Sequence, residues 1–492
     1  MEAHRAKKPD QSAAVTSSIE QEIKLAIDAD FRLPVLHGTH LSERTLTTVY
    51  FDTPDLRLLR AQITLRHRTE GRKHTWQLKL PLTCGRREVE MPGNASAPPA
   101  EMLSLLFIHL QGTTVGPIAT LRTRRTSTRV GSPKKQGAEV MLDQVAVLKD
   151  SSEVRTFREV EIERLHGDTA LADRLEKQLR QAGAFDHDGR PKIFRALDLP
   201  TPPPLKPPRR SDSIAEHLRY ILIRQLDILL SRDPGVRLGG ESEDVHQMRV
   251  ATRRMRAVLR AARPLLKREW EEPLRTRLGW LGRQLSAARD LDVQIAHFKG
   301  QCDSVKPQDR PALDRFIDYL QGERAKVQRQ LVRQLRRRRY VGLINRLTPA
   351  VREPMIVSDD ITLPDLAGKA FRKLQKAIKP LDDSASNAQW HGVRIRAKRA
   401  RYAAELSERY SGPAATQYLD KMKRVQELLG DIQDAVMAER HLRRFASKRE
   451  ERHSALIAGQ MIERARERRR EAKKAFGPVW KKVKKCGKRV WG

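Results

Sequence analysis

The second half of the chain contains one helical pattern twice, and this duplication restricts the fold more than any other feature. The first copy reads V-H-Q-M-R-V-A-T-R-R-M-R-A-V-L-R from Val245, and the second reads W-H-G-V-R-I-R-A-K-R-A-R-Y from Trp390. In the first copy, steps of three and four residues place cations on one helix face and largely apolar side chains on a second face. The pattern predicts two helices that each bury one stripe and together form two walls of a polyanion site.

The cations of the two copies are the candidate ligand contacts. They are His246, Arg249, Arg253, Arg254, Arg256 and Arg260 in the first copy, and His391, Arg394, Lys398, Arg399 and Arg401 in the second. Packing inside its own bundle is the alternative role for each histidine. Asp290 and Asp434 also align, and we expect them to orient arginines through buried ion pairs, because an unpaired buried charge is costly.

The net charge of +36, with a pI near 10.6, is spread unevenly along the chain. Residues 1–200 carry 31 Lys and Arg against 26 Asp and Glu, so nearly all of the excess lies in the remainder. Such a field favours nucleic acid, polyphosphate or an anionic membrane surface as partner. Aromatic residues make up 5% of the chain, which argues against base stacking on single-stranded nucleic acid.

The cysteines and the hydropathy pattern bear on the compartment. Cys84, Cys302 and Cys486 have no metal-site spacing and form no obvious disulfide framework. The first residues lack an apolar signal core, and no run of about 18 apolar residues occurs. We therefore expect a cytoplasmic protein in a reducing environment.

The chain reads as an α+β multidomain protein. Residues 1–17 form a polar leader that we expect to be flexible, residues 18–199 contain short alternating stretches typical of strands, and residues 200–211 are a Pro-rich linker. Residues 212–485 are helical and internally duplicated, with a candidate helix break over residues 233–240 and a very basic tail at residues 464–492. That tail is either a solvated helix end or a further anion-binding arm.

Several strands of the first half alternate charged and apolar residues. I-E-Q-E-I-K-L (19–25), L-R-H-R (65–68), W-Q-L-K-L (76–80) and E-V-E-I-E (159–163) follow this pattern. Because the charged faces mix acids and bases, they predict a closed antiparallel β-barrel with a charged lumen. Carboxylates bind Mg²⁺ or Mn²⁺, and arginines and lysines hold phosphate oxygens. The combination indicates a phosphohydrolase or nucleotidyl-transfer site.

The same segments resemble the CYTH domain, or triphosphate tunnel metalloenzyme fold. E-x-E-x-K, Y-F-D-T-P-D-L-R-L-L-R-A-Q-I-T-L-R-H-R (50–68), E-V-E-I-E and P-K-I-F-R-A-L (191–197) carry the resemblance. It implies an eight-stranded antiparallel tunnel that binds triphosphate-like substrates with Mg²⁺ or Mn²⁺. It also implies Glu20, Glu22, Glu161, Glu163 and Asp143 as metal ligands, Glu20, Glu22 and Lys24 as catalytic residues, and Lys24, Arg66, Arg68, Lys79, Arg125 and Lys192 as triphosphate contacts.

Two positions depart from that resemblance. Val145 stands where the family has the glycine of L-D-x-G, and Gln77 stands where it often has a second basic residue. These departures bear on turnover and on substrate identity. A binding tunnel does not depend on them.

The duplicated half resembles the CHAD domain over about residues 212–485. L-S-A-A-R-D-L-D-V (285–293) and L-G-D-I-Q-D-A-V-M (429–437) extend the match beyond the His/Arg helices. The resemblance implies two pseudo-symmetric helical bundles around a basic cavity that binds inorganic polyphosphate. It also implies a place on cytoplasmic polyphosphate granules.

Three functions stay open at this point. The first is a polyphosphate-binding protein with a metal-dependent triphosphatase or tripolyphosphatase domain. The second is a non-catalytic polyphosphate-binding or granule-targeting protein. The third is a nucleic-acid binder, although no helix-turn-helix, zinc-finger or stacking motif supports specific binding. A nucleotide cyclase or thiamine-triphosphate hydrolase also stays open for the tunnel, and no membrane partner is expected.

Overall fold

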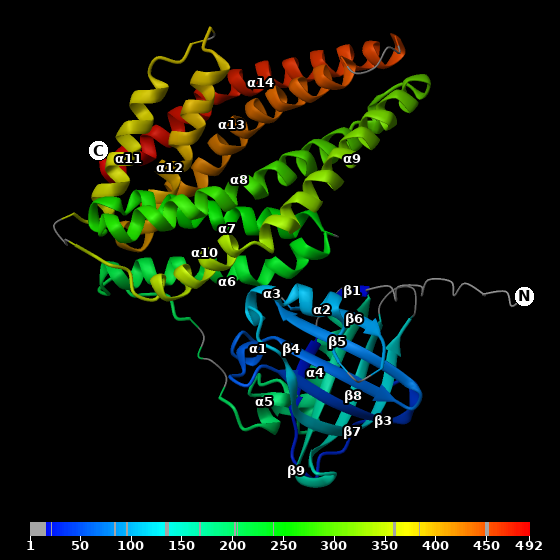
Figure 1. Cartoon of the computed structure of the whole chain (residues 1–492). Helices are drawn as coiled ribbons and strands as arrows, with labels where there is room; N and C mark the ends of the chain where they lie inside the picture. The colour runs from blue at the N-terminus through cyan, green and yellow to red at the C-terminus, as the bar shows by residue number, and fades with distance from the viewer. Residues whose placement is uncertain are drawn as a thin grey trace, which may run out of the picture. The chain divides into compact units, whose positions relative to one another are not determined.

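The chain divides into two compact units in the computed structural model, residues 1–204 and 205–492, and the boundary lies inside the Pro-rich segment (Figure 1). The structure describes residues 16–20, 22–82, 85–94, 97–132, 137–166, 169–200, 203, 205–239, 241–357, 361–382, 384–447 and 452–492. For Glu20, His166, Ser304 and residues 452–454 it describes the backbone alone. The first unit is built on strands and the second on helices, so the predicted α+β multidomain fold class is confirmed.

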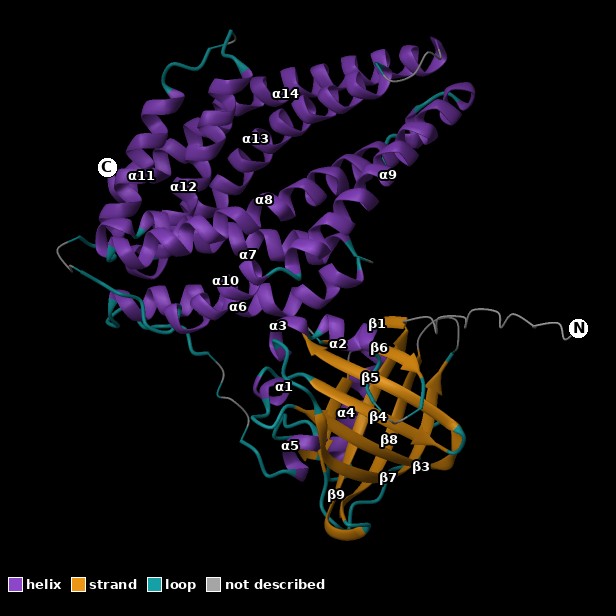
Figure 2. Cartoon of the chain, viewed as in Figure 1, coloured by secondary structure: helices purple, strands orange, loops and turns teal. Residues whose placement is uncertain are grey.

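The first unit contains a ten-stranded antiparallel sheet in the order β1-β6-β5-β4-β3-β7-β8-β9-β2-β10. Its strands are β1 (Thr16–Glu20), β2 (Glu22–Ala26), β3 (Gly38–Asp52), β4 (Thr64–Glu70), β5 (Lys73–Pro81), β6 (Arg86–Pro92), β7 (Gly116–Gly131), β8 (Gly137–Lys149), β9 (Ser152–His166) and β10 (Phe185–Asp186). Since β1 pairs with β6 and β2 pairs with β9, the segment that carries both strands joins the two sides of the sheet into a barrel (Figure 2).

The strand count differs from the eight that the resemblance implies. β1 and β2 are two stretches of one chain segment, and β10 adds only two residues beside β2. With that segment taken as one strand and β10 set aside, the barrel corresponds to the expected eight-stranded tunnel.

Strand β9 shows why the charges lie inside the barrel. Val160 and Ile162 are buried on the outer face against Leu175 and Leu179 of helix α4 (Ala170–Gln181). Alternate residues point to opposite faces of a strand, so Glu159 and Glu161 point into the barrel. An outer apolar face covered by a helix therefore forces the charged residues of this strand inward.

Four more short helices belong to the first unit: α1 (Arg57–Arg60), α2 (Ala100–Leu105), α3 (Phe107–Leu110) and α5 (Lys192–Ala196). Helix α5 positions the site, because its Ile193 and Phe194 are buried in one cluster with Tyr50 and Leu121 of the barrel. That packing fixes Lys192, the first residue of the helix, beside the barrel interior.

The second unit consists of helices. They are α6 (Ile214–Leu238), α7 (Ser242–Ala261), α8 (Arg268–Lys299), α9 (Arg310–Leu335), α10 (Arg338–Ala350), α11 (Leu363–Ile378), α12 (Asn387–Ser411), α13 (Pro413–Ala446) and α14 (Arg452–Trp491). The two sequence copies form α7 and α12, which contact each other, and the predicted apolar stripe of α7 is buried at Met248, Thr252, Met255 and Leu259. None of the described helices has a stretch long and apolar enough to cross a membrane.

The basic tail is part of the core of the second unit. Within α14, Phe476, Trp480 and Val483 are buried in a cluster with residues of α11, α12 and α13. The lysines and arginines of this segment therefore cover one face of an amphipathic helix whose other face packs.

One helix end falls later than the sequence indicates. A break is expected over residues 233–240, but α6 continues through Pro234 to Leu238. Asp233 is buried, lies 2.5 Å from Nε of Arg237, and accepts a hydrogen bond from the Tyr340 hydroxyl. These contacts hold the last helical turn, and the chain leaves the helix at Gly239, whose φ of 75° suits glycine.

Candidate functional site

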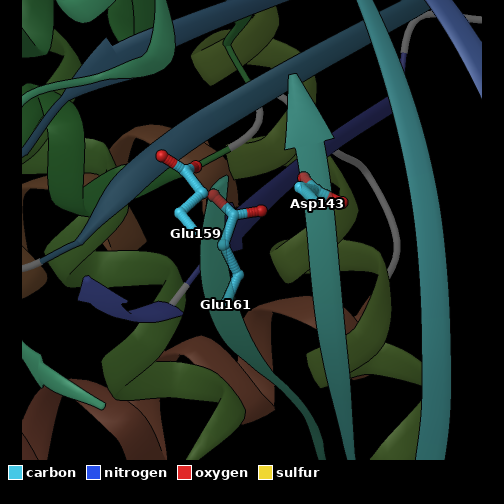
Figure 3. A group of neighbouring side chains, drawn as sticks. All are labelled: Asp143, Glu159 and Glu161. Carbon is cyan, nitrogen blue, oxygen red and sulfur yellow. The ribbon is translucent and has the colours of Figure 1, made fainter. Parts of the chain in front are cut away.

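Three buried carboxylates meet inside the barrel. Asp143 lies on β8 and Glu159 and Glu161 lie on β9, and one oxygen from each falls within 4.8 Å of the others (Figure 3). Asp143 and Glu159 are direct partners in the sheet register, which brings their side chains to one spot on the inner face. We call these three residues the acidic cluster.

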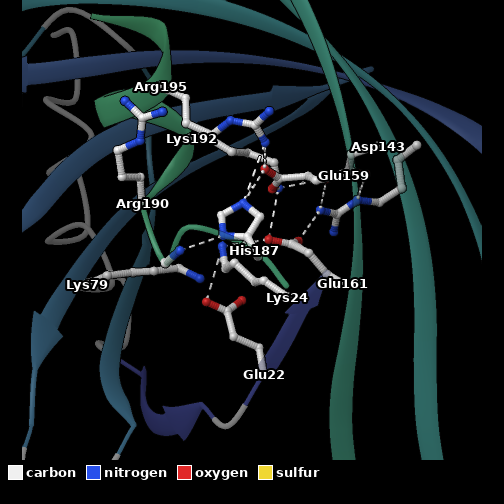
Figure 4. A network of polar contacts seen from close by, with 12 residues as sticks. Glu22, Lys24, Lys79, Asp143, Glu159, Glu161, His187, Arg190, Lys192 and Arg195 are labelled. Carbon is white, nitrogen blue, oxygen red and sulfur yellow. Dashed lines mark hydrogen bonds and ion pairs between the residues drawn. The ribbon is translucent and has the colours of Figure 1, made fainter. Parts of the chain in front are cut away.

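Cations contact the acidic cluster from several sides, and Figure 4 shows Lys24, Lys192 and Arg195 among them. Nζ of Lys192 lies 2.8 Å from Asp143, 2.8 Å from Glu159 and 3.0 Å from Glu161. Arg125 donates two hydrogen bonds to Asp143, at 2.7 and 2.6 Å, and a third to Glu161 at 3.1 Å. Lys24 lies 2.7 Å from Glu161 and Arg195 lies 3.0 Å from Glu159. These contacts offset the charge of the cluster where water is excluded.

The pKa directions indicate that Glu159, Glu161 and Lys192 are charged at neutral pH. Burial opposes ionisation of Glu161, but Lys192, Lys24 and Arg125 outweigh it and hold the pKa of that carboxyl well below its usual range. Burial also opposes ionisation of Glu159, but the charges of Lys192 and Lys24 outweigh it, and the pKa of this carboxyl falls to about 2. Burial likewise lowers the pKa of Lys192, yet Glu161, Asp143 and Glu159 raise it well above the ordinary value. These three groups therefore form a fixed array of charges, and neither Glu159 nor Glu161 is suited to donate a proton.

A basic cavity adjoins the acidic cluster. Tyr50, Arg66, Arg68, Arg125 and Lys192 are among the residues that line it. Burial and the charges of Arg66 and Arg125 lower the pKa of Arg68 to about 10, and its buried Nε has no hydrogen-bond partner in the described part of the chain. A buried guanidinium whose charge has few neighbouring anions and whose Nε has no acceptor among the described residues is suited to bind an anionic ligand.

Gln77, a departure from the family pattern, contacts an arginine that lines this cavity. Its Oε1 accepts a hydrogen bond of 2.8 Å from Nε of Arg66, and its Nε2 donates to Glu90. The amide thus orients Arg66, a role that a basic residue at this position would not perform.

The structure distributes the expected site residues over several places. Asp143 and Glu161 lie in the acidic cluster, whereas Glu22 and Glu163 pair with each other in the register of β2 and β9, outside it. Lys79 lies 3.7 Å from Glu88. Expected ligand Glu20 falls outside the described side chains.

The sequence analysis did not include Glu159 among the expected metal ligands, although this residue begins the E-V-E-I-E alternation and lies two residues before Glu161. The alternation alone was the signal that assigns it to the inner face. Arg195 and His187 also reach Glu159, at 3.0 and 3.5 Å, and no strand pattern could have indicated either of them.

In the helical unit, α7 and α12 bring four of the expected cations together. We call Arg249, Arg253, Arg394 and Lys398 the central site. Arg249 donates to Ser286 Oγ at 2.9 Å and lies 3.7 Å from Asp290, and Arg253 donates to the Tyr402 hydroxyl at 3.0 Å. Burial and the charges of Arg394, Arg253 and Arg249 lower the pKa of Lys398 to about 6.

The two histidines differ in their surroundings. Burial and the nearby charge of Arg289 lower the pKa of His246, whose buried Nδ1 has no partner among the described residues. His391 is exposed, and its Nδ1 lies 2.9 Å from Oε1 of Gln433.

The remaining expected cations fall into two groups. Arg254 and Arg401 both pair with Glu405, at 2.8 and 2.9 Å. Arg256, Arg260 and Arg399 are exposed. The eleven candidate residues therefore do not form one uniform lining.

Comparison with known proteins gives the family. The model of the CYTH domain family matches residues 18–192, and that of the CHAD domain family matches residues 220–443. Two uncharacterized proteins of Mycobacterium tuberculosis, MT2285 and Rv2226, are each 32% identical over 429 residues, covering 81% of this chain and 81% of the relative.

Among solved structures, PptA from Streptomyces chartreusis is 20% identical with a TM-score of 0.46, covering 54% of this chain and 99% of that one. The CHAD domain from Ricinus communis is 22% identical with a TM-score of 0.46, covering 58% and 96%. The two family matches and the mycobacterial relatives show that the chain belongs to the family in which a CYTH domain is followed by a CHAD domain.

Proposed function

We propose that the CYTH domain is a divalent-metal-dependent triphosphatase and that the CHAD domain binds inorganic polyphosphate. The observation that carries the proposal is the acidic cluster of Asp143, Glu159 and Glu161 beside a cavity lined by Arg66, Arg68 and Arg125. Oxygen donors for a metal and guanidinium donors for phosphate stand next to each other in the same barrel.

The residues of the acidic cluster fit Mg²⁺ or Mn²⁺. All three are carboxylates, the hard oxygen donors that these ions prefer, and the contacts of Lys192 show that they already hold one positive charge among them. A bound divalent ion would polarise a phosphoryl group and lower the pKa of water. Lys192 would then be free to contact a phosphate oxygen.

The chain's own cations would hold and orient the triphosphate. The buried Nε of Arg68 has no hydrogen-bond partner among the described residues, and Arg66 is held in place by Gln77. Positioning and charge stabilisation are the main requirements of phosphoryl transfer, and a fixed array of charges meets them. No base-recognition pocket is needed for a substrate that consists of phosphates alone.

Polyphosphate suits the CHAD domain because it is a regular polyanion without bases. The central site offers three arginines and a lysine whose pKa is lowered to about 6, so bringing negative charge there relieves repulsion among them. Both domains lie on one chain, so a polymer held by one domain is presented to the other at a raised effective concentration. We place such a protein on polyphosphate granules.

The deciding experiment is phosphate release from tripolyphosphate and from long-chain polyphosphate, with and without Mg²⁺ or Mn²⁺, with polymer binding recorded in the same samples. Metal-dependent release by the natural chain and its loss in Glu161→Gln would support the enzyme. Glu139→Gln is the matched control, because Glu139 is a buried, arginine-paired carboxylate of β8 outside the acidic cluster. Binding without release would favour the non-catalytic alternative.

Competition between polyphosphate and duplex DNA at matched salt separates the polyanions. We expect polyphosphate to displace DNA at equal charge concentration. If the protein instead retained DNA in preference to polyphosphate, the result would favour nucleic-acid binding as the function of the CHAD domain.

A further inference from the structure

The duplication that relates α7 to α12 is broken at one position. The offset that aligns His246 with His391 also aligns Arg254 with Arg399 and Arg256 with Arg401. Carried on to the next turn, it aligns Arg260 with Glu405, so a cation in one copy is a carboxylate in the other.

On the side of Glu405, the charges are neutralised. Its two oxygens contact Arg254 at 2.8 Å and Arg401 at 2.9 Å, and Arg401 also donates to Oε1 of Gln426 at 2.7 Å. The Glu405 side chain is 13% exposed, so the ion pairs are largely shielded from water. At this end of the central site, Arg254 and Arg401 are therefore engaged by protein groups and are not available to a polyanion.

On the opposite side, the corresponding positions hold only cations. Arg399 and Arg256 are the counterparts of Arg254 and Arg401, and Arg260 takes the place of the carboxylate. Partial burial and the charges of Arg260, Arg396 and Arg256 lower the pKa of Arg399. Among the described residues, no carboxylate lies within ion-pair distance of these three arginines.

A neighbouring helix makes room for this group of cations. Gly279 of α8 lies under Arg256, and a Cβ at that position would come within 3.2 Å of the guanidinium Nε. Partial burial and the charges of Arg275, Arg283 and Arg260 lower the pKa of Arg256. The absence of a side chain at Gly279 thus lets a guanidinium lie against α8 beside other cations.

The arginines of α7 connect the two places. Arg249, Arg253, Arg256 and Arg260 follow one another in steps of four, three and four, so they share one face along roughly 16 Å of helix. The matching stripe of α12 runs from Arg394 through Lys398 and Arg401 and ends at Glu405. A polyanion that leaves the central site meets further cations along α7 and a neutralised network along α12.

We infer that Arg256, Arg260 and Arg399 form a second polyanion subsite, which extends the central site in one direction only. We call it the flank subsite. Its ligand is the same chemical class, a linear polyphosphate long enough to continue past the central site. The inference rests on the proposed polyphosphate binding and adds to it that the pseudo-symmetric CHAD domain binds the polymer asymmetrically.

The test is a charge exchange at the broken position, measured as affinity for long-chain polyphosphate with a chelator present to prevent turnover. Arg260→Glu reproduces beside Arg399 and Arg256 the arrangement that Glu405 makes with Arg254 and Arg401, so the fold should be retained. We expect affinity to fall roughly tenfold or more, and the slope of log affinity against log salt to become shallower by about two.

The converse variant removes the carboxylate that pairs with Arg254 and Arg401. Glu405→Arg gives α12 the same run of cations as α7, and we expect affinity to rise by a similar factor. The double variant Arg260→Glu/Glu405→Arg moves the flank subsite to the other side and should return affinity to near that of the natural chain.

Arg329→Glu is the control, because it makes the same charge change at an exposed position on α9. Thermal unfolding of each variant checks the fold. If Arg260→Glu loses no more affinity than Arg329→Glu, or if Glu405→Arg gains none, the flank subsite does not exist. If the natural chain binds no polyphosphate, the proposed function fails first.

Discussion

Nζ of Lys192 lies 2.8 Å from the carboxylate of Asp143, and this contact joins helix α5 to strand β8 across the interior of the barrel. The same ammonium group contacts Glu159 and Glu161, so one lysine compensates three buried carboxylates. Lys192 therefore stabilises the fold in the absence of another cation and competes with any metal that binds there. Stability and metal binding should be linked through this side chain.

Removal of Lys192 should make the fold dependent on metal. In Lys192→Met the acidic cluster loses its central cation, and we expect destabilisation of about 3–5 kcal/mol, the usual cost of breaking a buried pair. Mn²⁺ or Mg²⁺ should restore much of this loss and raise the unfolding temperature more than in the natural chain. Lys177→Met, on the exposed face of α4, is the control. Equal metal responses in the natural chain and Lys192→Met would argue against a metal site at the cluster.

Glu159 should matter as much as Glu161 for metal binding, although sequence motifs pointed only to the latter. Glu159→Gln keeps the size of the side chain and removes one anionic oxygen donor from the cluster. We expect metal affinity to fall about 10- to 100-fold or more, measured by calorimetric titration of Mn²⁺. An unchanged titration would remove Glu159 from the ligand set, and Glu139→Gln again serves as the control.

Arg68 should oppose stability and favour ligand binding. Because it is buried near Arg66 and Arg125, Arg68→Met relieves repulsion, and we expect the ligand-free protein to unfold at the same or a higher temperature. Loss of a charge-assisted hydrogen bond should weaken tripolyphosphate binding roughly 10-fold or more. Thermal unfolding and calorimetric titration check the two effects. A destabilised variant with full affinity would contradict both.

Lys398 should take up a proton when polyphosphate binds. Its pKa of about 6 leaves the amine mostly neutral at pH 7.5, and a nearby polyanion favours the ammonium form. Affinity should therefore fall as pH rises from 6 to 8. Calorimetry in two buffers of different ionisation enthalpy measures the uptake.

The control for that titration is Lys398→Arg, which keeps the charge throughout this pH range. We expect proton uptake to decrease in this variant while affinity at pH 7.5 increases. Uptake equal to that of the natural chain would assign the proton to another group, such as His246, whose pKa is also lowered.

Much of the architecture follows from local patterns in the sequence. The alternation E-V-E-I-E fixes which residues of β9 share a face, and the repeated His/Arg pattern predicts both α7 and α12. These features depend on periods of two and about 3.6 residues, which any window of the chain reveals. The continuation of α6 through Pro234 escaped this reasoning, because the contacts that hold it come from Arg237 and from the distant Tyr340.

Which charges meet was decided by the tertiary structure. Asp143 joins Glu159 and Glu161 because of the register between β8 and β9, and Lys192 reaches them because α5 packs on the barrel core. Likewise, Arg254 and Arg401 form ion pairs while Arg256 and Arg399 form none with the residues that the structure describes, because only one copy places a carboxylate at the facing position. The sequence by itself determined the fold class and the faces that carry charge. Register and packing between distant segments determined the partners, because the distance between two charges is set by the whole fold and not by the local period.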